Sequence, residues 1–318
     1  MSADQSHTHV GVPVTALLLY RSAERTVATT FLKALNEAVR NEGEHFAFAP
    51  TGDDGCHVFQ GSRHHVVIEE VEARLPAADF STALAHPFIE TVFPAARPIV
   101  EGHAAHVRIV VAGGHAGNAA AHPDVDSLDL DDFGPDAVLP RLRILRAAAN
   151  AYAGQRFPLA VHWCQSDHLL AGPDYVQLAE KGAETELFVK AIPYSGSGGA
   201  TYGAISNGAT SVIGREVELA EAAVPPAWAV DRLLQFVEKA RAEVPLAGQA
   251  LRFPSDEIVL VHDEPESRMF PLGHLRLTVE KLPDGLVAPH VHDRQEEASI
   301  GFLGEMDART AQRAFGRR

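Results

Sequence analysis

The stretch "HAAHVRIVVAGG", residues 103–114, decides the predicted fold, because it supplies the strand that completes a regular order of elements. Its apolar run is short and ends at two glycines, which is typical of a buried strand. Before it, the spacing of apolar residues and the turn-forming residues predict a strand at 14–20, a helix at 22–43, a strand at 44–50, two extended segments within 56–76 that meet at 60–62, and a helix at 79–94.

The order strand, helix, strand, strand, helix, strand is that of a ferredoxin-like split βαβ unit, in which both helices cover one face of an antiparallel sheet. The predicted class is therefore α+β, with antiparallel sheets and helices packed on one face. Further along, residues 137–155 predict a helix with Pro140 in its first turn, and 158–172 predict one more strand. From about residue 180 the same kinds of element recur, which is consistent with a loose duplication.

This reading divides the chain into four parts. We expect a flexible N-terminus at 1–13, an α+β unit at 14–180, a second α+β unit at 181–286, and a loosely attached tail at 287–318. Within the first unit, residues 115–136 are rich in Asp, Gly, Ala and Pro and predict an exposed acidic loop.

The charge of the chain limits the classes of partner, and its cysteine content bears on the cellular compartment. The chain of 318 residues carries 42 acidic and 27 basic residues, a net charge of -15, which disfavours nucleic acid and anionic membranes as partners. A cationic protein partner would suit this charge, and simple solubility is the alternative. Two cysteines make no disulfide framework, and the N-terminal residues lack a secretory pattern, so we expect a cytoplasmic protein. Nothing in the sequence indicates an oligomeric state.

The 17 histidines raise the question of a metal site. On a strand, His162 and Cys164 would point to one face and Trp163 to the other, and His168 could join them only if the strand bends near Ser166. A closed zinc site needs four ligands, so we favour buried side chains that fill the sheet over a metal site. The weak metal candidates are His103, His106, His162, Cys164 and His168.

Other residues could extend such a site. These are His64 and His65 on a neighbouring predicted strand, His115, His122 and the Asp residues 124, 126, 129, 131 and 132 in the acidic loop, and His290 and His292 in the tail. The chain has no HExxH pair, and the Asp spacing does not fit a calcium loop. We therefore predict no cofactor, with a transition metal as the alternative.

The sequence nominates no catalytic residue. The Gly-rich stretch "SGSGGATYG", residues 195–203, lacks the GxxxxGK[ST] pattern of a phosphate loop, and no GxSxG nucleophile turn occurs. A hairpin connection explains these glycines.

Three stretches carry a resemblance to a family: 64–88; 103–114 with 141–170; and "GATYGAISNGATSVIGREVELAEAAVPPAWAVDRLLQFVEKA", 199–240. Together they resemble bacterial proteins grouped as domain of unknown function 4261. The resemblance implies a bacterial α+β protein and brings no catalytic residue. The family's recurring positions match Tyr202, Gly203, Gly208, Gly214 and Arg215. These residues would form either a ligand-binding loop or a structural one, and in the structural case Arg215 would pair with an acidic neighbour such as Glu216 or Glu218.

Three functions are therefore expected, in this order. The first is a non-enzymatic binding or interaction protein, in one version an immunity-type inhibitor that covers a cationic active site. The second is a metal-dependent enzyme that uses the central His, Cys and Asp residues. The third is a small-molecule binding domain around Tyr202.

Overall fold

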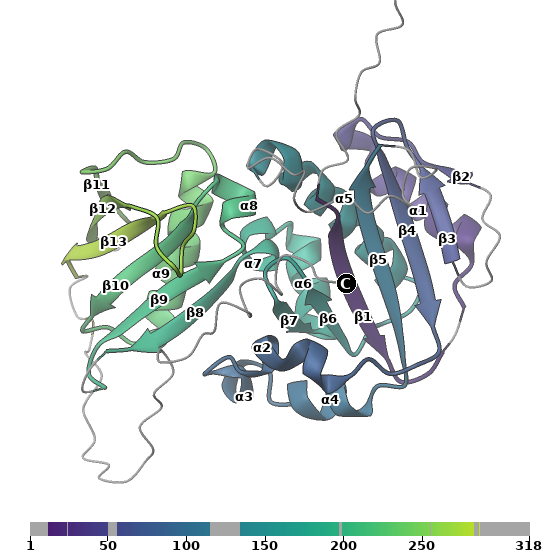
Figure 1. Ribbon diagram of the computed structural model, residues 1–318, viewed down its shortest axis with the longest axis horizontal. Helices are drawn as coiled ribbons and strands as arrows, with labels where there is room; N and C mark the ends of the chain where they lie inside the picture. Colours follow the sequence, from purple (N-terminus) through teal and green to yellow (C-terminus); the bar gives the residue numbers. More distant parts are fainter. Residues whose placement is uncertain are drawn as a thin grey trace, which may run out of the picture. The chain divides into compact units, whose positions relative to one another are not determined.

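The computed structural model describes residues 12–23, 25–49, 56–114, 134–196, 199–254, 256–282 and 286. It separates the chain into two compact units, with the division between Phe188 and Val189 (Figure 1). The sequence boundary was placed at residue 180, but the helix α7 (Glu184–Phe188) belongs to the first unit. The acidic loop at 115–133, the segment 1–11 and the tail at 287–318 lie outside the described residues. Both units combine helices with mainly antiparallel sheets, so the α+β class is confirmed.

The first unit is built on a seven-stranded sheet in which all adjacent strands are antiparallel. Its order is β2-β3-β4-β5-β1-β6-β7. The strands are β1 (Val14–Tyr20), β2 (Ala47–Ala49), β3 (Cys56–Gln60), β4 (His64–Val71), β5 (Ala105–Gly113), β6 (Ala160–Trp163) and β7 (His168–Ala171). β1 lies inside the sheet because it is apolar on both faces: Leu18 and Leu19 are both fully buried.

The sheet order is not ferredoxin-like. β4 and β5 are connected through helices, yet they are adjacent and antiparallel, with His64 opposite Gly113. The strands of a βαβ unit would instead be parallel. The hairpin expected at 60–62 is present as β3 and β4, but the ferredoxin-like order of the strands is not.

Helices cover both faces of this sheet, whereas the sequence predicted one covered face. α5 (Pro135–Ala153) packs on β5 and β1, and α1 (Ala28–Ala38) packs on α5. The ring of Tyr20 lies 6.1 Å from that of Tyr152 on this side. Leu19 points to the opposite face and packs in a cluster with Phe80 and Val100. That cluster comes from the 3-10 helix η2 (Ala77–Phe80) and from α2 (Ser81–Leu84), α3 (Ile89–Val92) and α4 (Ala96–Gly102).

Proline explains two departures from the predicted helices. The single helix expected from Asp79 to just before Pro94 is a series of short turns because Pro87, between α2 and α3, lacks the N–H that a helix interior needs. α5 begins at Pro135, so Pro140 lies in its second turn and not in its first. A 3-10 turn, η1 (Arg40–Glu42), follows α1 and ends at Gly43, whose φ of 69° is left-handed.

The stretch at 158–172, expected as one strand, is a hairpin. β6 and β7 are joined by the four residues from Cys164 to Asp167, and Trp163 lies opposite His168. Asp167 has a φ of 49°, a left-handed conformation that Asp tolerates in turns. Trp163 packs near Tyr175 of α6 (Gly172–Lys181) and Phe188 of α7. The hairpin is therefore fixed to the helical layer through its tryptophan.

The second unit is a six-stranded sheet of order β11-β12-β13-β10-β9-β8, with α9 (Pro226–Ala240) packed on β8, β9 and β10. Its strands are β8 (Lys190–Ser195), β9 (Tyr202–Asn207), β10 (Glu216–Ala222), β11 (Ala250–Arg252), β12 (Ile258–Glu264) and β13 (His274–Lys281), with the short helix α8 (Thr210–Ile213) before β10. The pair β10 and β13 is parallel, and the other neighbours are antiparallel. β12 and β13 form an antiparallel pair, with Val261 opposite Leu277.

A buried ion pair lies in the second unit. Arg232 of α9 pairs with Glu257, and their side chains are only 4% and 0% exposed. The guanidinium also lies over the ring of Phe253, 4.5 Å from its centroid. Among the helices that the structure describes, none is long and apolar enough to cross a bilayer.

Candidate functional site

The side chain of His103 is neutral and is held in a fixed position beside the sheet. Its Nδ1 lies 2.8 Å from the carbonyl oxygen of Val100, and its Nε2 accepts a hydrogen bond of 3.0 Å from the backbone N–H of Leu75. Burial lowers the pKa of His103 below its usual value. With both ring nitrogens used by the backbone, this histidine has no lone pair to offer a metal.

The other histidines of the predicted metal set lie elsewhere. Nδ1 of His106 lies 2.7 Å from the carbonyl oxygen of Ala73. His64 is opposite Gly113, at the far end of β5, and its Nδ1 lies 2.9 Å from the carboxylate of Glu44. His65 contacts the carbonyl oxygen of Gly114. Within the described part of the chain, no three His, Cys, Asp or Glu side chains are arranged to hold a metal ion. His115, His122, His290, His292 and the Asp run lie outside that part.

His162 and Cys164 do come together, as strand alternation predicts. The sulfur of Cys164 lies 3.9 Å from Nδ1 of His162, while Trp163 points to the opposite face. His168 lies across from Trp163 and therefore shares the face of Trp163, so it does not join the pair. The partner on the other side of the imidazole is Asp167, whose Oδ1 lies 2.7 Å from Nε2 of His162.

The sequence analysis did not nominate Asp167. The run Gln165-Ser166-Asp167 between two short apolar segments is a turn signal, and it could have indicated a hairpin that returns Asp167 toward His162. Burial acts to lower the pKa of His162, but hydrogen bonds to Asp167 and Cys164 outweigh it and raise the pKa to about 9. The side chains therefore form a chain of thiol, imidazole and carboxylate, with the imidazole in the middle.

The turn that follows β9 in the second unit is filled by a side chain of the same chain. The carboxylate of Glu216 accepts hydrogen bonds from the backbone N–H groups of Gly208, Ala209 and Thr210, at 3.0, 3.3 and 3.2 Å. The hydroxyls of Ser206 and Thr210 donate to the same carboxylate, at 2.5 and 3.0 Å. The donors that would bind an anionic ligand here are thus occupied by the protein.

The residues that match the family resemblance have roles in the backbone turns and packing of the second unit. Gly208 and Gly214 have φ values of 101° and 83°, which only glycine adopts readily. A side chain at Gly203 would meet the ring of Tyr194 at 2.5 Å. Tyr202 begins β9 opposite Ser195. Arg215 pairs with Asp263, 3.0 Å away, and not with the predicted Glu216 or Glu218.

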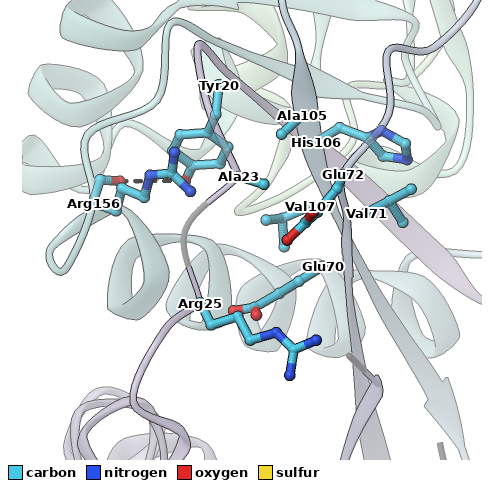
Figure 2. Close-up of a pocket in the computed structure, with 10 residues that line it drawn as sticks. All are labelled: Tyr20, Ala23, Arg25, Glu70, Val71, Glu72, Ala105, His106, Val107 and Arg156. Atoms are coloured by element: carbon cyan, nitrogen blue, oxygen red, sulfur yellow. Dashed lines mark hydrogen bonds between the residues drawn. The ribbon is translucent and has the colours of Figure 1, made fainter. Parts of the chain in front are cut away.

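A small pocket of about 70 Å³ lies in the first unit where β1 and β4 end and β5 begins (Figure 2). Its walls include Tyr20, Glu70, Glu72, Val107 and Arg156. In Figure 2 the carboxylate of Glu72 lies beside Val107 and that of Glu70 turns toward the start of the Arg25 side chain, while the imidazole of His106 points away from Val107. Sequence reasoning missed this pocket because Glu70 and Glu72 come from one strand end and Tyr20 from another.

Comparisons with family models, curated proteins and solved structures find no match. The resemblance to domain of unknown function 4261 therefore stays a prediction.

Proposed function

We propose that this protein is a binding protein whose partner inserts a lysine or arginine side chain into the pocket between Glu70 and Glu72. The observation that carries the proposal is that both glutamates line one space of about 70 Å³. That volume suits one ammonium or guanidinium group and is far below the several hundred Å³ of a typical small-molecule site.

Glu70 is positioned for such a role by the helical layer. Its Oε1 accepts hydrogen bonds from the backbone N–H of Thr26, at 2.9 Å, from the hydroxyl of Thr26, and from the hydroxyl of Tyr152, at 2.7 Å. Its Oε2 is buried and has no hydrogen-bond partner among the described residues. A buried carboxylate oxygen without a donor is costly.

Two arginines, Arg25 and Arg156, line the pocket together with the two glutamates. Glu72 is exposed and has no ion-pair or hydrogen-bond partner in the described ranges. Arg156 is engaged elsewhere: its guanidinium lies over the ring of Tyr20, 4.4 Å from the centroid, and donates to Ser22. The net charge of -15 would also attract a cationic partner over a longer range.

The two other expected functions have weaker support. The small-molecule reading depends on the glycine region around Tyr202, where β8 and β9 form a hairpin and the hydroxyl of Thr201 already donates to the carboxylate of Glu221. The metal-enzyme reading depends on histidines that are held apart by their own hydrogen bonds. We propose a cytoplasmic location as well, because both cysteines are outside disulfides.

The proposal is tested with blocked tripeptides Gly-Arg-Gly and Gly-Lys-Gly, titrated into the full chain and followed by backbone amide NMR. We expect saturable shifts at Val107 and Glu72, and none with Gly-Gln-Gly. Glu72→Gln should weaken peptide binding about fivefold, equivalent to roughly 1 kcal/mol. Glu90→Gln removes an equal charge at an exposed position outside the pocket and should change nothing. Equal affinities for Glu72→Gln and the unsubstituted protein would overturn the proposal.

A further inference from the structure

The turn between β6 and β7 places a thiol, an imidazole and a carboxylate in series. The sulfur of Cys164 lies 3.9 Å from Nδ1 of His162, and Nε2 of the same ring lies 2.7 Å from Asp167. Cys164 is partly exposed, whereas the imidazole side chain is only 6% exposed. This site is separate from the pocket of Glu70 and Glu72 and does not depend on the function proposed for it.

The surrounding fold holds these three groups in place. The backbone N–H of Cys164 donates to the carbonyl oxygen of Thr15 on β1, at 3.1 Å. Phe80 covers the imidazole, with 5.2 Å between the ring centroids. The left-handed conformation of Asp167 directs its carboxylate back to His162. A site whose members are fixed by strand pairing and packing is organised before any reagent arrives.

The chemistry follows from which atoms face each other. When Nε2–H donates to Asp167, Nδ1 faces the sulfur and can take the thiol proton. The product is a thiolate beside an imidazolium that the carboxylate stabilises, and a thiolate is the reactive form of cysteine.

We propose that Cys164 is a reactive thiol that hydrogen peroxide oxidises to a sulfenic acid. The thiolate attacks one peroxide oxygen, so that an S–O bond forms as the O–O bond breaks. Sulfur loses two electrons, the peroxide gains them, and the departing hydroxide takes the proton from the His162 imidazolium and leaves as water. The imidazolium thus serves first to stabilise the thiolate and then as the acid for the leaving group.

The oxidised sulfur has no second thiol within reach in this unit. Cys56 lies on β3, four strands away from β6 in the sheet order. At ~4.8 Å per strand the separation is about 19 Å, well beyond the ~7 Å that a disulfide allows between Cα atoms. A sulfenic acid at Cys164 would therefore react with a small external thiol, giving a mixed disulfide and water.

The test uses the full chain with hydrogen peroxide as oxidant and a 1,3-dione as the trap for sulfenic acid, with peptide mass spectrometry to quantify each cysteine. Cys56 is the internal control, because it is also partly exposed and outside a disulfide. We expect Cys164 to be labelled at least about tenfold faster than Cys56. Asp167→Asn, which keeps the shape of the side chain, should slow labelling of Cys164 and leave Cys56 unchanged.

Equal labelling of the two cysteines in the unsubstituted protein would overturn the proposal. So would an unchanged rate at Cys164 in a folded Asp167→Asn variant. If that variant fails to fold by circular dichroism, the comparison of the two cysteines in the unsubstituted protein decides the question by itself.

Discussion

The carboxylate of Glu216 accepts a hydrogen bond from the backbone N–H of Gly208, 3.0 Å away, and so occupies the turn that a ligand would otherwise fill. The turn has the glycine and the clustered donors of an anion-binding loop, and the anion is supplied by the next strand of the same chain. Glu44 does the same in the first unit, where it accepts from the backbone N–H groups of Ser62 and Arg63.

Glu216 should therefore be needed for stability. Replacing it with alanine leaves the donors of Gly208, Thr210 and Ser206 without their acceptor, and we expect a loss of about 2–4 kcal/mol in the free energy of unfolding. Urea denaturation followed by circular dichroism measures this loss. Glu280→Ala, at an exposed position of β13, is the matched control and should change stability by less than about 0.5 kcal/mol. Similar midpoints for both variants would contradict this assignment.

Removing one charge of the buried pair Arg232 and Glu257 should lower the stability of the fold more than removing both charges. Glu257→Gln leaves the Arg232 guanidinium buried without its counter-charge, and we expect a cost of about 3–5 kcal/mol. The double variant Arg232→Met/Glu257→Leu removes both charges at once and should be clearly more stable than Glu257→Gln. The measurement is denaturant unfolding of the two variants and the unsubstituted protein. A double variant less stable than the single one would show that the pair itself stabilises the fold.

His103 should make stability depend on pH. Because burial lowers the pKa of His103 in the folded protein, the unfolded chain takes up this proton first as the pH falls below its ordinary value of 6.5. Stability should therefore fall as the pH decreases from 6.5 toward the folded pKa, by at most about 1.4 kcal/mol per pH unit. Protonation at Nε2 would also abolish its hydrogen bond from Leu75.

Unfolding free energies between pH 5 and 7 test this effect. His103→Gln cannot titrate, so its stability should vary less with pH than that of the unsubstituted protein. His45→Gln, at an exposed position, is the control and should keep the original pH dependence. Parallel curves for His103→Gln and the unsubstituted protein would rule out His103 as the cause.

Local sequence patterns were sufficient to predict most strands of the first unit. The apolar runs at 14–20 and 103–114 are β1 and β5, and the break at 60–62 is the turn between β3 and β4. Alternation also placed His162 and Cys164 on one face and Trp163 on the other. These features depend on neighbours within a few residues, which the sequence displays directly.

Pairing between distant segments was not predictable in the same way. The order of elements fits more than one sheet, and only side chains buried on both faces of β1 place it between β5 and β6. Arg215 forms an ion pair with Asp263, 48 residues away in the sequence, although Glu216 and Glu218 are closer in sequence. Asp167 was missed because one expected strand proved to be a hairpin, which reversed the direction of the chain.

The central position of β1 has a consequence for how the first unit is made. Both of its neighbours, β5 and β6, come much later in the chain, so its hydrogen bonds close long loops. During synthesis on the ribosome, the successive strands β2, β3 and β4 can pair soon after they emerge. The apolar strand β1 emerges earlier but stays unpaired until β5 and β6 have been synthesised. During that interval β1 is the part of the nascent polypeptide that a chaperone would shield.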